Sequence, residues 1–250
     1  MRVPHPQPVK RRSRLPAFAC GCVVTLVMVA AVMVVGLVLL GPSLPGLALQ
    51  IFGGFSPAGN TNDVFAEVTP PPVVEVQNAV VPQEVVIQAG DLGSQTINPA
   101  DVNADVLVGS SDTGAPLATV TFGEADLLLL CQQRSDVCAG TNPQFRVSQF
   151  DLRPGGVVAY GEAYVPQLNR WQALGVVMQL ENSRQFRVVG IDINGQLFAT
   201  PPDPNIQQLV AQAEQVGNDT LTQLAISAGG TTYTLSEVYA DDNNLTLVLR

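Results

Sequence analysis

The chain has 250 residues, of which 46% are hydrophobic and only 13% are charged, and its formal net charge is −9 at pH 7. A chain this apolar can bury a substantial core, while 21 acidic residues against 12 basic ones leave it negatively charged. Because a negative surface repels polyanions, this balance excludes nucleic acid as a partner held by general electrostatic attraction.

The first predicted element is an apolar run without charged side chains at residues 17–40, shortly after a basic cluster at positions 10–14. About 20 apolar residues cross a bilayer as a helix, and a basic flank stays on the cytoplasmic side. We therefore expect a cytoplasmic tail over residues 1–16, a single-pass anchor in the cell membrane over residues 17–41, and an extracytoplasmic remainder. A cleaved signal peptide is the alternative, although its apolar region is shorter, at about 7–15 residues.

The next segment, residues 42–117, is rich in Pro and Gly and contains three consecutive prolines at positions 70–72. Proline removes backbone donors and interrupts regular elements, and consecutive prolines favour an extended chain. This composition predicts an extracytoplasmic stalk. Two short stretches, residues 85–88 and 106–108, have the composition of strands, and the sequence leaves open whether they add edge strands to the following domain.

The folded domain is expected over residues 118–250, a normal length for one domain. Thr121 and Glu124 have the spacing of a capping box, which predicts a short apolar helix from Phe122 to about Gln132. A meander of strands follows this helix, then a second helical segment, and then a final group of strands.

Alternation of apolar and polar residues predicts the strands, and turn residues separate them. The meander covers residues 145–152, 157–165, 174–180 and 186–193. Asn194 and Gly195 are a strong hairpin signal, and Asp203 before Pro204 is a typical helix start. Gly217 leaves open whether one long helix or two short ones follow. The last strands cover residues 224–228, 231–240 and 245–249. The expected fold class is α+β with an antiparallel sheet packed on one or two helices.

Cys131 and Cys138 flank a short polar loop after the first helix. On the oxidising side of a membrane, two cysteines at this spacing favour a local disulfide, and a pair of free buried thiols is the alternative. The only histidine is His5, so the ligands of a structural zinc site are missing from the domain. We expect neither a metal nor a cofactor.

The predicted domain contains few of the residue types that act in catalysis, because no His and no Lys follows Lys10. This excludes histidine-dependent nucleophilic systems and Schiff-base lysines. One string, residues 112–115, matches the D-[ST]-G-[AS] motif of aspartic proteases, and residues 188–190 match the hydrophobic-hydrophobic-Gly element of that family. The string occurs once, so a protease based on Asp112 would require a dimer, and a polar turn is the simpler interpretation. We expect no enzymatic activity.

The domain resembles the LmeA-like phospholipid-binding domains of bacterial envelope proteins. Thr121 and Glu124 with four leucines at positions 127–130 match the opening helix of that family. The strings LRPGGVVAYGE and VVGIDINGQLFATPPDPNIQQLV match its strand meander and its proline-started amphipathic helix. The resemblance covers about half of the chain. It implies a tubular lipid-binding fold, in which helices pack into a curved sheet and an apolar groove holds acyl chains.

The function that we expect is non-catalytic binding of a lipid or another apolar ligand by a membrane-anchored extracytoplasmic domain. A structural or protein-interaction module of the cell envelope is the main alternative, followed by the aspartic protease. The expected ligand contacts are Leu174, Val176, Met178 and Phe186 on the strands and Ile206, Leu209, Val210 and Ala213 on the helix. The same alternation would form a filled core, and the sequence does not separate the two.

Overall fold

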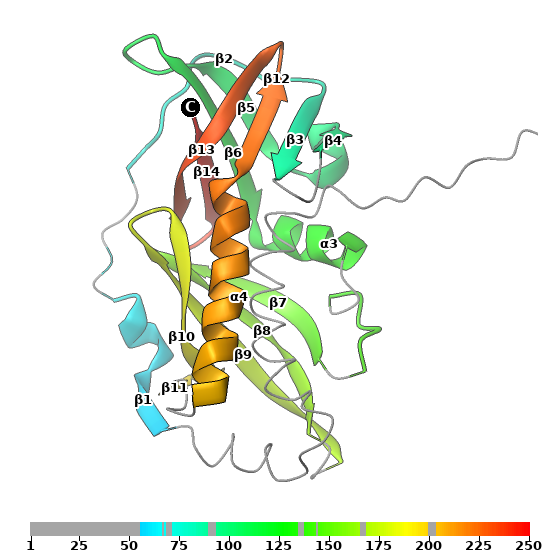
Figure 1. The fold of residues 1–250 in the computed structure, drawn as a ribbon, viewed down its shortest axis with the longest axis vertical. Helices are drawn as coiled ribbons and strands as arrows, with labels where there is room; N and C mark the ends of the chain where they lie inside the picture. Colours follow the sequence, from blue (N-terminus) through cyan, green and yellow to red (C-terminus); the bar gives the residue numbers. More distant parts are fainter. Residues whose placement is uncertain are drawn as a thin grey trace, which may run out of the picture.

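The structure is a computed structural model. It describes residues 56–66, 68, 72–89, 94–134, 138–143, 145–165, 169–199 and 204–250. In these residues two antiparallel sheets follow one another along the long axis of the molecule (Figure 1). The fold is mostly β, with 58% strand and 16% helix. The expected α+β class is therefore wrong, chiefly because the predicted stalk also forms strands.

The six-stranded sheet contains the predicted meander. Its spatial order is β1 (Ser56–Asn60), β11 (Gln196–Ala199), β10 (Gln185–Ile193), β9 (Arg170–Glu181), β8 (Gly156–Val165) and β7 (Phe145–Arg153). The hairpin between β10 and β11 is the predicted one, and Asn194 and Gly195 both have the positive φ that its two-residue turn requires. The edge strand β1 was not predicted, since it comes from the proposed stalk.

The eight-stranded sheet combines the C-terminal strands with most of the predicted stalk. Its order is β2 (Gln77–Val80), β5 (Asp105–Ser110), β6 (Pro116–Gly123), β14 (Asn244–Leu249), β13 (Thr231–Ala240), β12 (Leu224–Ala228), β3 (Val85–Ala89) and β4 (Ser94–Ile97). The prolines do not prevent this, because they lie outside the paired segments or at their ends. Pro82 lies between β2 and β3, Pro99 begins the 3-10 helix η3 (Pro99–Val102), and Pro116 is the first residue of β6.

Two α-helices lie in the described part of the chain, α3 (Glu124–Arg134) and α4 (Pro204–Thr222). The segment from Pro204 thus forms one helix, which packs against β10 (Figure 1). Helix α3 begins two residues later than expected because Thr121 is still paired with Thr246 in the sheet. Its start is capped by Asp126, whose carboxylate accepts a hydrogen bond from the N–H of Gly123 at 3.1 Å.

One hydrophobic core joins the two sheets and both helices. Its largest fully buried side chains are Phe150, Leu152, Met178, Leu221, Leu224, Ile226 and Leu249. These residues come from strands of both sheets and from α4, so the two sheets share an interior.

Both helices use side chains to complete the open edges of the six-stranded sheet. Glu124 on α3 accepts a hydrogen bond at 2.8 Å from the N–H of Leu152 on the edge strand β7. At the other side, β11 pairs with only the last residues of β10. Helix α4 covers the unpaired part of β10: Glu214 accepts from the N–H of Val188 at 2.6 Å, and the Asn218 amide bonds both backbone groups of Phe186. These side chains replace a missing strand.

The half-buried position of Glu214 predicts a pH-dependent stability. Burial raises the pKa of Glu214, while the hydrogen bond from Val188 and the charge of Arg187 lower it to a smaller extent. A carboxyl whose pKa is higher in the folded state stabilises the fold as the pH falls from neutral through that folded pKa, and the gain is complete below its unfolded pKa. Glu214→Gln keeps an oxygen acceptor for Val188, so we expect its stability at pH 7 to match or exceed that of the parent.

The control for this prediction is Glu214→Leu, which leaves the N–H of Val188 without an acceptor. We expect this variant to lose about 1–3 kcal/mol of unfolding free energy at pH 7. Urea unfolding at pH 7 and pH 5 measures both effects, and Glu214→Gln should also reduce the difference between the two pH values. Equal destabilisation by Gln and Leu at pH 7 contradicts the assignment.

The predicted membrane localisation requires a correction. Within the described residues, no helix combines the length and the apolar character needed to span a bilayer. The expected tail over residues 1–16 and the expected anchor over residues 17–41 lie outside the described residues. We therefore withdraw the single-pass localisation with a cytoplasmic N-terminus.

Candidate functional site

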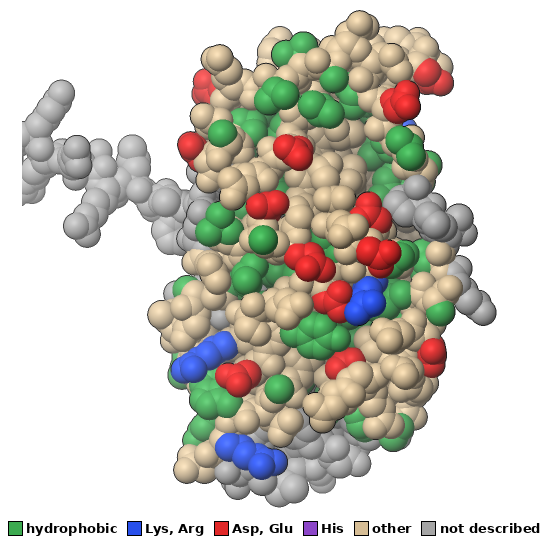
Figure 2. All heavy atoms as spheres, turned by 180° about the vertical axis from the view of Figure 1, so that it is seen from behind, with side chains coloured by type: hydrophobic (Ala, Val, Ile, Leu, Met, Phe, Trp, Pro, Cys, Tyr) green, Lys and Arg blue, Asp and Glu red, His purple; other side chains and the backbone are tan. Residues whose placement is uncertain are grey.

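The six-stranded sheet carries an open groove of about 810 Å³ on the face turned away from α4. Helix α4 lies in front of this sheet in Figure 1, and Figure 2 views the molecule from behind. Tyr160 and Glu162 of β8 line the groove. They alternate with Ala159 and Ala163, which are buried in the core, so the groove lies on the outer face.

Two small residues of β9 shape this part of the outer face. Ala173 of β9 pairs with Glu162, and Gly175 pairs with Tyr160 on one side and with Asp192 on the other. A Cβ atom on Gly175 would lie only 2.7 Å from Cε1 of Tyr160. The absence of this atom leaves room for the ring of Tyr160 against β9. Ala173 lines the hollow beside this ring, together with Glu162 of β8 and Asp192 of β10.

Asp192 forms a buried part of the groove wall, with only 2% of its surface exposed. One carboxylate oxygen accepts a hydrogen bond from the N–H of Gly195 at 3.0 Å, and the other accepts from the hydroxyl of Thr61. Thr61 lies on the 3-10 helix η1 (Thr61–Val64), and its own N–H donates to the carbonyl of Gly195 at 3.1 Å. The segment that follows β1 is thus held against the groove wall by the hydrogen bonds of Thr61 with Asp192 and Gly195.

Phe65 follows η1 and extends this attachment over the same outer face. It is buried in a small second cluster with Val158, Val177 and Leu197. The outer face of the sheet therefore has two parts, one covered by the segment around Phe65 and the other open as the groove.

An aromatic pair lies beside the open end of the groove. Arg146 lines the groove, and its guanidinium lies 4.1 Å from the ring centroid of Trp171. The rings of Trp171 and Tyr164 are 5.6 Å apart, and the hydroxyl of Tyr164 donates to the side chain of Asn169 at 2.5 Å. These contacts hold the side chains in defined positions before any ligand is present.

The groove side chains offer both donors and acceptors at neutral pH. Burial raises the pKa of the Tyr160 phenol, and the charges of Asp192 and Asp151 raise it further. Tyr160 therefore remains a hydroxyl donor well above neutral pH. Glu162 supplies an exposed carboxylate, and Asn194 at the end of β10 supplies an amide.

The structure places most of the predicted ligand contacts in the core instead. Five of the eight are buried, with exposures between 0 and 7%, namely Leu174, Val176, Met178, Phe186 and Val210. Leu174 is the one member of this set that also lines the groove. Ile206, Leu209 and Ala213 lie in α4, but their side chains are outside the described part of the structure.

The groove residues were missed because the apolar stripe marks only the inner face of a strand. A weaker signal was present in the sequence. Trp171, Ala173 and Gly175 occupy alternate positions of β9 and therefore share the outer face. Of these three residues, Ala173 lines the groove.

The predicted disulfide between Cys131 and Cys138 is confirmed to the extent that the two cysteines lie at disulfide distance. Their sulfur atoms lie 2.03 Å apart, and both residues belong to the core at the end of α3. The neighbouring residues Gln132 and Gly140 line the groove, so this connection also fixes one end of it.

The residues of the possible protease motif are not brought together. Asp112 lies exposed in the turn between β5 and β6, where the N–H of Ser111 donates to the carbonyl of Ala115 at 2.8 Å. The hydrophobic-hydrophobic-Gly element at residues 188–190 belongs to β10 in the other sheet. In the described residues, no group of three or more His, Cys, Asp or Glu side chains has a metal-binding arrangement.

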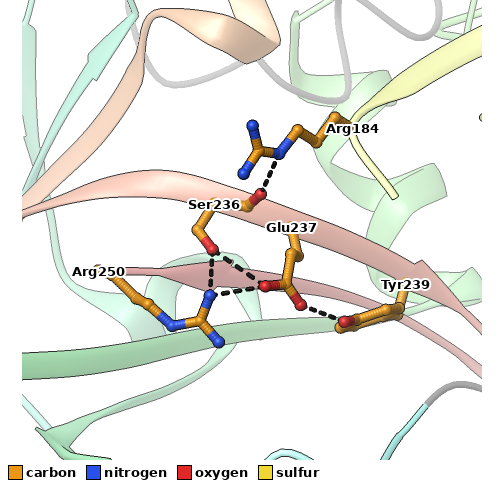
Figure 3. Close-up of polar contacts among 5 residues, drawn as sticks. All are labelled: Arg184, Ser236, Glu237, Tyr239 and Arg250. Atoms are coloured by element: carbon orange, nitrogen blue, oxygen red, sulfur yellow. Dashed lines mark hydrogen bonds and ion pairs between the residues drawn. The ribbon is translucent and has the colours of Figure 1, made fainter. Parts of the chain in front are cut away.

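A second polar cluster lies on β13 (Figure 3). Glu237 accepts hydrogen bonds from the hydroxyl of Tyr239 and, at 2.6 Å, from Arg250. The bonds from Tyr239 and Arg250 lower the pKa of Glu237, whereas burial and the same carboxylate raise the pKa of Tyr239 to about 12. Arg184, from the turn between β9 and β10, donates to the carbonyl of Ser236 at 2.9 Å. This cluster joins the two sheets and has its polar groups paired, so we interpret it as structural.

Comparison with protein-family models, curated proteins and solved structures finds no match. The resemblance to LmeA-like domains therefore stays a prediction.

Proposed function

We propose that the chain is a non-catalytic ligand-binding protein whose binding site is the groove on the outer face of the six-stranded sheet. The observation that carries this proposal is the hollow lined by Ala173 of β9 together with Tyr160, Glu162 and Asp192. Ligand sites are concave, measure about 300–1,000 Å³ and contain a few convergent polar groups. A volume of about 810 Å³ is within that range.

Binding is a better interpretation than catalysis because the described groove residues show no nucleophile paired with a base: Glu162 is an exposed carboxylate, while the hydroxyl of Ser148 donates to the carbonyl of Tyr160. Both carboxylate oxygens of Asp192 already accept hydrogen bonds within the protein. Tyr160 has a raised pKa, so it is a poor base near neutral pH. The chain also has no His or Lys after Lys10.

The outer groove is also preferred to the space between the sheet and α4. Met178 and Val176 have no exposed surface, and they pack in the core that joins both sheets. A ligand between the sheet and α4 would have to displace packed side chains, and this displacement would destabilise the fold. A ligand in the outer groove displaces only solvent.

Trp171 provides a direct test, since it is the only tryptophan of the chain and contacts the groove residue Arg146. We would titrate the full chain with neutral oligosaccharides, fatty acids, tetramethylammonium and inorganic phosphate while recording tryptophan fluorescence. We expect a saturable change with one of these classes. Ala173→Phe should abolish that change by filling the floor of the groove, without a loss of folded structure in circular dichroism, since Ala173 is exposed.

The matched control is Val73→Phe, which adds the same side chain at an exposed position of irregular structure, outside the described strands and helices. It should bind like the parent. No fluorescence response to any class, or equal binding by the Ala173→Phe variant, contradicts the proposed site.

A further inference from the structure

We infer that the ligand of the groove is a neutral carbohydrate chain. This inference rests on the proposed function and specifies the chemistry that the groove recognises. It follows from three properties of the lining: the mixture of hydrogen-bonding groups, the aromatic ring of Tyr160, and the charge.

The hydrogen-bonding groups suit hydroxyls, each of which donates and accepts. Glu162 presents a carboxylate acceptor, Arg146 presents guanidinium donors, and Tyr160 and Asn194 each offer both functions. They belong to β7, β8 and the β10–β11 turn, so they face the hollow from both of its sides. A ligand with several hydroxyls can pair with all of them, whereas an acyl chain would leave them unpaired at a cost.

An aromatic ring suits the apolar face of a sugar ring. Tyr160 lines the groove with its ring against Gly175, and it is the aromatic contact that we assign to the ligand, whereas the ring of Trp171 already lies under Arg146 and serves only as a fluorescent reporter. Aromatic rings with a polar group at one end provide flat apolar contact together with a hydrogen bond. A sugar ring has the complementary pattern, with C–H groups on its faces and hydroxyls at its rim.

The charges argue against ionic ligands. Two carboxylates, Glu162 and Asp192, and one guanidinium, Arg146, line the groove. The negative balance disfavours phosphates and carboxylates, in keeping with the predominance of acidic over basic side chains on this side of the molecule (Figure 2). Arg146 already occupies the Trp171 ring, so a ligand ammonium would have to displace it or lie beside another cation.

The experiment is a titration of the full chain with soluble neutral oligosaccharides of glucose, mannose, galactose and N-acetylglucosamine, followed by Trp171 fluorescence. We expect saturable binding of at least one of them. Glu162→Gln should weaken it about tenfold, as loss of one charge-assisted hydrogen bond does. Tyr160→Ala should abolish it, and Tyr160→Phe should retain part of it, because the ring remains. Circular dichroism verifies the fold of each variant.

Competition separates the possible outcomes. The same oligosaccharide carried by neutral glycolipids in phosphatidylcholine vesicles should compete with the free sugar, while plain vesicles should not. If fatty acid, tetramethylammonium or phosphate binds instead and Ala173→Phe blocks it, the groove is the site and the carbohydrate assignment is wrong. If no probe binds, both the carbohydrate assignment and the proposed function are overturned.

Discussion

Replacement of Met178 by Ala is expected to lower the free energy of unfolding by about 2–5 kcal/mol. Met178 has no exposed surface and lies on β9, on the face that packs toward the core shared by the two sheets. Removal of its side chain leaves a cavity, because β9 is paired on both sides by β8 and β10 and cannot move to fill it. Urea unfolding followed by circular dichroism measures the loss.

The control for this variant is Val73→Ala, which truncates a side chain that is 87% exposed. Its unfolding free energy should stay within about 0.5 kcal/mol of the parent. A small loss for Met178→Ala together with saturable uptake of a fluorescent fatty acid would indicate a ligand cavity at this position, and would reverse the assignment of this face to the core.

Removal of the disulfide between Cys131 and Cys138 is expected to have the next largest effect on the free energy of unfolding. The variant with both Cys131→Ala and Cys138→Ala should lose about 2–3 kcal/mol of unfolding free energy, because a short closed loop no longer restricts the unfolded chain. Alanine is chosen because both positions are buried in the core, where a serine hydroxyl would need a partner. Thermal unfolding with and without reductant measures the effect.

In this experiment the parent should become less stable when a reductant is added, and the double variant should not respond to it. Intact mass after alkylation gives a second measurement, since the oxidised parent has no reactive thiol at either position. Alkylation of Cys131 and Cys138 in native, unreduced protein would refute the link.

Much of the C-terminal half was predictable from local patterns. The alternation along β8, β9 and β10 and the turn at Asn194 and Gly195 were sufficient, because each element depends on neighbouring residues. The helix from Pro204 was equally clear from its periodicity. The long N-terminal region was predicted only in part, since its prolines indicated an extended stalk and only residues 85–88 and 106–108 had the composition of strands. Those two stretches lie within β3 and β5, which are interior strands of the eight-stranded sheet and not edge strands, because β3 pairs with β12 and β4, and β5 pairs with β2 and β6.

The groove could not be predicted from local sequence patterns, for a related reason. Which outer residues remain open depends on the segment around Thr61, which reaches Asp192 across 131 positions of sequence. No periodicity in either segment reports this contact. The apolar alternation identified the inner face of the strands correctly but assigned to it the binding role that we now propose for the opposite face.

The glutamates of α3 and α4 have a consequence for self-association. An open strand edge offers backbone groups to a strand of another molecule, and such pairing leads to aggregation. Glu124 and Glu214 hold the backbone N–H groups of Leu152 and Val188 that an incoming strand would need. On the other sheet, Asn78 has a positive φ that interrupts the regular course of the edge strand β2. Detachment of α3 or α4 would expose these N–H groups and give a strand of another molecule a place to pair.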